Sequence, residues 1–148
     1  MIHVIDDNQL LRETIATIIL TTQFDCLSFK GGECYLDYMD SGEYLNPKVV
    51  LSDVRMQGIN GYELTLKIRE NHPFQKIILM SGESTAEFKI SAEAELCSYI
   101  FKPFRAEKLI ELLNDLADCA VPFQGSVSSD PEKCVYNKHQ NCPFYCKK

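Results

Sequence analysis

The sequence has few basic residues, since 15 lysines and arginines stand against 21 aspartates and glutamates and give a formal net charge of −6. A nucleic-acid-binding surface needs a basic patch, so we expect no DNA partner. No apolar run approaches the roughly 18 residues of a membrane-spanning helix, and we expect no membrane partner. The chain also lacks a basic amino-terminal region followed by a cleavage site, which favours a cytoplasmic protein without a signal peptide.

Apolar residues are plentiful by contrast, at 45% of the 148 residues. This length and composition predict one ordinary domain with a real hydrophobic core and a short appendage. The seven cysteines would suggest disulfides in a secreted protein. Without an export signal, free thiols or metal ligands are the better interpretation.

Strand-like and helix-like segments alternate along the chain. We expect strands at Ile2–Ile5, Cys26–Phe29, Val49–Ser52, Ile77–Met80 and Tyr99–Phe101. The third and fourth are continuously apolar, which is typical of strands covered by helices on both faces. Apolar residues at helical spacing follow each strand, and the thinnest apolar stripe is that of the fourth expected helix, around Thr85–Ala94. Five such units predict an α/β fold with a doubly wound, five-stranded parallel sheet and five helices.

The sequence changes character after Ala120. Val121-Pro122 ends the last expected helix, and a stretch rich in serine, with glycine and proline, follows it. We therefore expect a domain at residues 1–120, a linker at 121–131 and a separate tail at 132–148.

Charged residues stand at the ends of three expected strands. Asp6 and Asp7 follow the first, Asp53 the third and Lys102 the fifth. A carboxylate at the end of a buried strand is costly unless it is solvated, metal-bound or chemically used, and open α/β sheets bind ligands at the carboxyl ends of their strands. Carboxylates suit Mg²⁺, and a lysine ammonium suits a phosphoryl group. The pattern predicts a combined cation and phosphoryl site.

A purely structural interpretation competes with this one. Asp is a favoured residue at a helix amino terminus, and Pro103 could simply open the last helix. Helix capping, however, explains neither Asp53 nor Lys102, so the joint pattern favours chemistry.

The set Asp6-Asp7, Asp53, Ser81-Gly82 and Lys102-Pro103 resembles that of the response-regulator receiver family, which is CheY-like, over residues 1–120. The resemblance implies a flavodoxin-like sheet with strand order 2-1-3-4-5. It also implies that Asp53 is the phospho-acceptor.

Further roles follow from the same resemblance. Asp6, Asp7 and Asp53, with the backbone carbonyl of Arg55, would hold Mg²⁺. Ser81 and Lys102 would bind the phosphoryl oxygens, and Ser81 and Tyr99 would act as the switch pair.

The sequence departs from the family pattern in three places. Gln57 stands where a proline usually follows the methionine, Asn60 stands where an acidic residue is common, and Leu96-Cys97 replaces a Gly-Ala pair. None of these positions carries the expected chemistry.

We expect a stand-alone response regulator that is phosphorylated by a sensor histidine kinase. Its output would be binding to a downstream protein or relay to a histidine phosphotransfer protein, and it would be no enzyme beyond its own phosphotransfer and dephosphorylation. One alternative is a pseudo-receiver that binds partners without phosphorylation. A phosphatase with an aspartyl-phosphate intermediate would need a second aspartate where Arg55 stands. A metal- or redox-sensing module is a third alternative.

The tail carries a cluster of metal-ligating residue types. Cys134, His139, Cys142 and Cys146 could bind Zn²⁺ as three thiolates and one imidazole, and a metal would supply folding energy that so short a segment lacks. A disordered tail, a tail docked through its aromatic residues, a disulfide and an iron–sulfur cluster stay open as alternatives.

Overall fold

The computed structural model describes residues 1–82 and 98–118. The strands are β1 (Ile2–Ile5), β2 (Cys26–Phe29), β3 (Val49–Asp53), β4 (Ile77–Ser81) and β5 (Ser98–Phe101). The helices of the described residues are α1 (Gln9–Leu20), α2 (Gly32–Asp40), α3 (Gly61–Asn71) and α5 (Ala106–Asp118). The helix expected around Thr85–Ala94, the linker at 121–131 and the tail at 132–148 lie outside the described residues.

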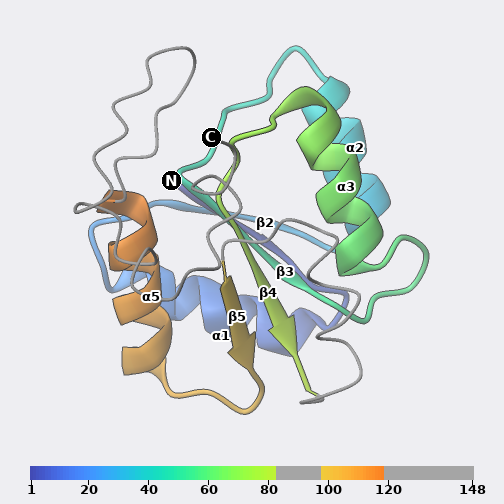
Figure 1. Cartoon of the computed structure of the whole chain (residues 1–148). Helices are drawn as coiled ribbons and strands as arrows, with labels where there is room; N and C mark the ends of the chain where they lie inside the picture. The colour runs from blue at the N-terminus through green and yellow to red at the C-terminus, as the bar shows by residue number, and fades with distance from the viewer. Residues whose placement is uncertain (83–97, 119–148) are drawn as a thin grey trace, which may run out of the picture.

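The five strands form one parallel sheet in the order β2-β1-β3-β4-β5 (Figure 1). This confirms the doubly wound, flavodoxin-like fold. β3 and β4 each run one residue further than the sequence predicts, and the added residues are Asp53 and Ser81. Every residue of these two strands is buried, as their continuous apolar runs predict.

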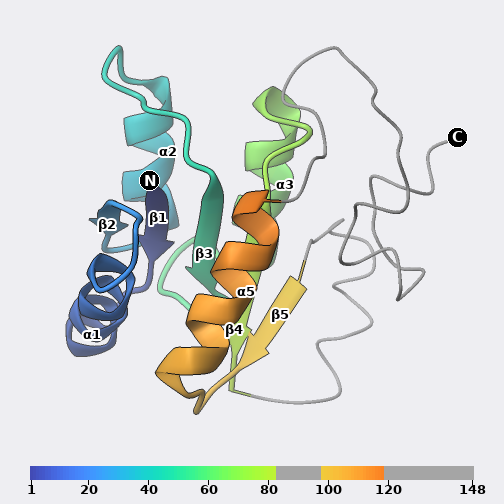
Figure 2. The same cartoon turned by 90° about the vertical axis from the view of Figure 1, so that its left-hand side faces the viewer.

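Helices cover both faces of the sheet, with α1 and α5 on one side and α2 and α3 on the other (Figures 1 and 2). Side chains alternate between the faces along each strand, so β1 sends Val4 toward one layer and Ile5 toward the other. The α1/α5 core comprises Ile2, Val4, Ile15, Ile19, Phe24, Val49, Leu51, Ile78, Met80, Ile100, Leu109, Leu112, Leu113 and Leu116. The α2/α3 core comprises Ile5, Tyr35, Val50, Val54, Tyr62, Leu64, Ile68, Ile77 and Leu79.

Two asparagines fix where helices begin beside the carboxyl edge of the sheet. The Asn8 side chain accepts the backbone N–H of Leu11 and caps α1. Asn60 caps α3 more completely, because its side chain accepts two backbone N–H groups while the Glu63 carboxylate accepts the N–H of Asn60. Such a reciprocal box satisfies amides that the first turn of a helix leaves unpaired.

Within residues 1–82 and 98–118, no helix is long and apolar enough to cross a membrane.

Candidate functional site

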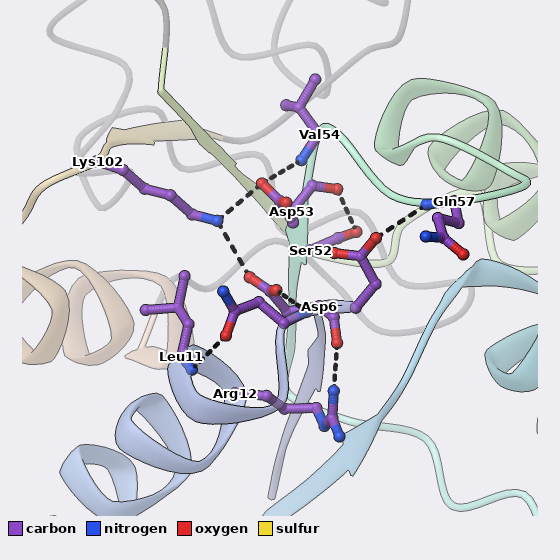
Figure 3. Close-up of polar contacts among 10 residues, drawn as sticks. Asp6, Leu11, Arg12, Ser52, Asp53, Val54, Gln57 and Lys102 are labelled. Carbon is purple, nitrogen blue, oxygen red and sulfur yellow. Dashed lines mark hydrogen bonds and ion pairs between the residues drawn. The ribbon is translucent and has the colours of Figure 1, made fainter.

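The carboxyl ends of β1, β3 and β5 bring three charged side chains into contact. Lys102 Nζ lies 3.1 Å from Asp6 Oδ2 and 2.9 Å from Asp53 Oδ1 (Figure 3). Lys102 is 96 residues from Asp6 in sequence, and β3 and β4 lie between their strands, so the long lysine side chain reaches across the carboxyl edge of the sheet. The predicted convergence of acids and lysine at this edge is therefore present.

Asp7 completes a cluster of three carboxylates. One oxygen from each of Asp6, Asp7 and Asp53 lies within 4.8 Å of the others. Asp6 is fully buried and Asp53 is 8% exposed, whereas Asp7 is exposed. Three ionised carboxylates against one ammonium leave a local excess of two negative charges, and a small divalent cation with oxygen ligands would balance it. The donor set therefore fits Mg²⁺.

Burial governs the protonation of the acceptor candidate. Removal from water raises the pKa of Asp53, and the hydrogen bond and positive charge of Lys102 oppose that rise without cancelling it. Asp6 adds a further repulsion that disfavours the charged form. A bound cation would act in the same direction as Lys102, because an opposite charge nearby favours the ionised carboxylate.

Backbone amides orient the carboxylates of β1 and β3. The N–H of Asn8 donates to Asp6 Oδ1 at 2.8 Å, and the N–H of Val54 donates to Asp53 Oδ1 at 2.9 Å. The guanidinium of Arg12 donates to the backbone carbonyl of Asp6 at 2.6 Å. Asn8 and Arg12 were not predicted as part of the site, because neither contact follows from a recurring spacing in the sequence.

The β3–α3 loop approaches the same cluster from the other side. The N–H of Gln57 donates to Asp7 Oδ2 at 3.0 Å across 50 residues of sequence (Figure 3). Gly61 lets α3 begin directly beside the acceptor strand, since a Cβ there would lie 2.4 Å from the Asp53 carbonyl oxygen. A side chain at position 61 would therefore push the loop away from Asp53.

The remaining predicted residues lie on β4, on β5 and in the β3–α3 loop. The N–H of Lys102 donates to the Ser81 carbonyl at 2.7 Å, so these two residues are adjacent, and Ser81 is buried. Tyr99 pairs in register with Leu79 and packs against the α2/α3 core. The Arg55 side chain is exposed, two positions beyond Asp53. The Lys102-Pro103 peptide bond is cis.

The four proposed zinc ligands, Cys134, His139, Cys142 and Cys146, lie outside the described residues. Their zinc site stays a prediction.

A parallel sheet of order 2-1-3-4-5 with an acidic cluster and a lysine at its carboxyl edge defines a receiver-type domain. Residues 2–114 match the family model described as the response regulator receiver domain. This match covers most of the chain, and the chain belongs to that family.

Related proteins agree with this assignment. The chain is 28% identical over 114 residues to the DNA-binding transcriptional regulator NtrC of Escherichia coli, covering 76% of this chain and 24% of NtrC. It is 30% identical over 120 residues to the transcriptional regulatory protein DegU of Brevibacillus brevis, covering 78% of this chain and 49% of DegU. The chain thus spans about a quarter and about half of these two proteins.

Solved structures repeat the fold. The chemotaxis response regulator CheY4 of Vibrio cholerae superposes with a TM-score of 0.70 at 19% identity, covering 78% of this chain and 96% of that one. The receiver domain of NtrX from Brucella abortus superposes with a TM-score of 0.68 at 23% identity, covering 79% and 98%.

Proposed function

We propose that this receiver domain is a phosphorylation-operated switch in which Asp53 accepts a phosphoryl group from a sensor histidine kinase. The observation that carries the proposal is the contact of Asp53 with both Lys102 and a cluster of two further carboxylates at one sheet edge. Phosphoryl transfer depends on positioning and charge stabilisation more than on covalent chemistry by the protein, and this edge supplies both.

The step itself is a transfer between two nucleophiles. A carboxylate oxygen of Asp53 forms the new O–P bond while the P–N bond of the kinase phosphohistidine breaks, and the electron pair of that bond stays on the imidazole nitrogen. Asp6, Asp7 and Asp53, with the Arg55 carbonyl, would hold Mg²⁺. When bound, the ion neutralises charge on the phosphoryl group.

Lys102 and Ser81 would bind the oxygens of the phosphoryl group once it is on Asp53. The Lys102 ammonium is a compact charge that now bridges Asp6 and Asp53, and it would turn to a phosphoryl oxygen once Asp53 is modified. The Ser81 hydroxyl would donate to another oxygen, because a hydroxyl can rotate to suit its acceptor. Tyr99, on the neighbouring strand, would respond as the second member of the switch pair.

Phosphorylation-dependent binding to a protein target, or relay to a histidine phosphotransfer protein, would be the output. The domain would catalyse only its own phosphotransfer and dephosphorylation, in the cytoplasm. A pseudo-receiver that acts without phosphorylation is the alternative, and an intact acid and lysine set gives no support to it.

Mass spectrometry after incubation with acetyl phosphate tests the proposal. We expect one added phosphate per chain in the presence of Mg²⁺ and none with a chelator. Asp53→Asn should abolish the modification, whereas Asp37→Asn, a change at an exposed position of α2, should leave it intact. Labelling that persists in Asp53→Asn would place the acceptor elsewhere.

The zinc site of the tail is a separate proposal. Three thiolates and one imidazole from Cys134, His139, Cys142 and Cys146 would make a closed, structural site. Protein purified without added metal should then contain about one zinc per chain by elemental analysis. A metal-free protein would refute the site.

A further inference from the structure

The β3–α3 loop is attached at two points by carboxylates from two other elements. Asp7, just after β1, accepts the N–H of Gln57 at 3.0 Å. Glu33, in the first turn of α2, accepts the N–H of Ile59 at 2.8 Å. The two attachments are two residues apart in the loop but come from segments 26 residues apart in sequence. The loop therefore bridges the acidic cluster and α2.

The loop packs closely against Glu33 and the first turn of α2, and two glycines allow this approach. Gly58 lies between the two attachment points and has φ +77°, a conformation that favours glycine. A Cβ on Gly58 would lie 2.1 Å from Glu33 Oε1, and a Cβ on Gly32 is 3.1 Å from the Ile59 carbonyl oxygen. The loop and the first turn of α2 can approach this closely because residues 32 and 58 are both glycine.

Glu33 is also well placed electrostatically. A carboxylate in the first turn of a helix is stabilised by the partial positive charge of the helix amino terminus. Hydrogen bonds to an ionised acceptor are stronger than those between neutral groups. Glu33 therefore gives Ile59 a firm anchor even though its side chain is exposed.

The Gln57 amide differs from the other amides that bind the acidic cluster. Asp6 and Asp53 receive their backbone N–H groups from residues one or two positions away. Asp7 receives its N–H from a loop 50 residues away. The orientation of Asp7 therefore depends on where that loop lies, whereas the other two carboxylates are held by local amides and by Lys102.

We propose that the Gln57 amide positions the Asp7 carboxylate for Mg²⁺, and that Glu33 is a positioning residue that holds the loop presenting this amide. The inference rests on the proposed function, because it assigns Asp7 to the metal. A hydrogen bond from this amide to Oδ2 limits the rotation of the Asp7 carboxylate. Partners that orient a metal ligand commonly change metal affinity about tenfold or more when they are removed.

Two matched pairs of variants in the full chain test this inference. Gln57→Pro removes the amide hydrogen, and Gln57→Ala removes the side chain but keeps the amide. Glu33→Ala removes the acceptor for Ile59, and Glu33→Gln keeps an oxygen that can accept.

Isothermal titration with Mg²⁺ alone provides the main measurement. We expect Gln57→Pro to weaken Mg²⁺ binding about tenfold and Gln57→Ala to bind like the wild type. Glu33→Ala should weaken binding by less than Gln57→Pro does, with recovery in Glu33→Gln, because Glu33 acts only through the loop. The amide resonance of Gln57 should shift in Glu33→Ala, which a change in global stability alone would not produce.

Equal Mg²⁺ affinities for folded Gln57→Pro and Gln57→Ala would overturn the role of the amide. If Gln57→Pro fails to fold, wild-type affinity in Glu33→Ala would overturn the proposal instead. Absence of Mg²⁺ binding by the wild type would refute both this inference and the metal site of the proposed function. Normal wild-type binding with unaffected variants would refute the inference alone.

Discussion

The two faces of the sheet are built from different chemistry. The α1/α5 core is formed by aliphatic side chains and methionine, and Phe24 is the one aromatic side chain among the buried members that the structure describes. On the α2/α3 side, His3 is fully buried among four aromatic rings, those of Phe29, Tyr35, Tyr38 and Tyr44, at centroid distances of 5.5 to 6.3 Å. The second face therefore buries an imidazole and the Tyr35 hydroxyl, whereas the first is mainly aliphatic, with the Cys26 thiol packed against it.

This difference separates two sources of stability. Aliphatic packing depends on buried area and shape and is insensitive to pH. Burial, assisted by the positive amino terminus, lowers the pKa of His3 to about 4, so the folded protein prefers the neutral imidazole. The acid sensitivity of the described domain should therefore arise partly from the α2/α3 side, and the next predictions test that separation.

The largest expected effect is on the aliphatic side. Leu113→Ala removes a fully buried side chain of α5 and should lower the free energy of unfolding by about 2–5 kcal/mol in urea titrations. The loss should be the same at pH 5 and pH 7, because no titrating group is involved. The control is Leu66→Ala on α3, at a side chain that is 51% exposed, which should change stability by less than about 0.5 kcal/mol. A pH-dependent loss in Leu113→Ala would contradict the separation of the two faces.

The second prediction concerns His3 and pH. Because its folded pKa of about 4 lies below the usual value of about 6.5, the unfolded chain binds the extra proton first as the solution is acidified. The His3 contribution is fully present above pH 6.5 and is lost as pH falls from 6.5 to 4. Over this range the free energy of unfolding should fall by about 3 kcal/mol because of His3. Urea titrations across this range should show it.

His3→Phe should remove that part of the pH dependence, since phenylalanine fits among aromatic rings and cannot be protonated. The difference between the two proteins isolates His3, because the carboxylates that titrate in the same range are common to both. Identical pH slopes for wild type and His3→Phe would show that His3 does not couple folding to protons.

A smaller effect is expected at Tyr35, whose hydroxyl lies 3.1 Å from His3 Nδ1. Tyr35→Phe keeps the ring but leaves a buried imidazole nitrogen without this partner, which should cost about 1–3 kcal/mol at pH 7. Tyr38→Phe is the matched control, because the Tyr38 hydroxyl binds the N–H of Leu45 at an exposed position. If Tyr35→Phe and Tyr38→Phe lower the free energy of unfolding equally in thermal or urea unfolding, the contact between Tyr35 and His3 does not stabilise the fold.

The smallest effects are expected at the helix caps on the two faces of the sheet. Asn60→Ala removes a reciprocal box at α3, and Asn8→Ala removes a single cap at α1. Each should cost about 1 kcal/mol, with Asn60 the larger because its side chain accepts two amides. A larger loss for Asn8→Ala in urea unfolding would reverse this order.

Much of the fold follows from patterns that are local in sequence. Apolar runs such as Ile77–Met80 predict buried strands, and alternation with helical spacing predicts a doubly wound sheet, because strands and helices have different side-chain periods. The meeting of Asp6, Asp53 and Lys102 was also predictable. Parallel strands place their carboxyl ends at one edge, so each strand needs only to end in a charged residue.

Contacts that depend on through-space packing were decided by the tertiary structure alone. The amino-acid sequence determines that β1 is an apolar strand, but only the arrangement of β2, α2 and the loop after α2 buries His3 among four rings. The same holds for Gln57 with Asp7 and for Glu33 with Ile59. Such hydrogen bonds require an ångström-level approach of distant loops, and no local periodicity encodes that distance.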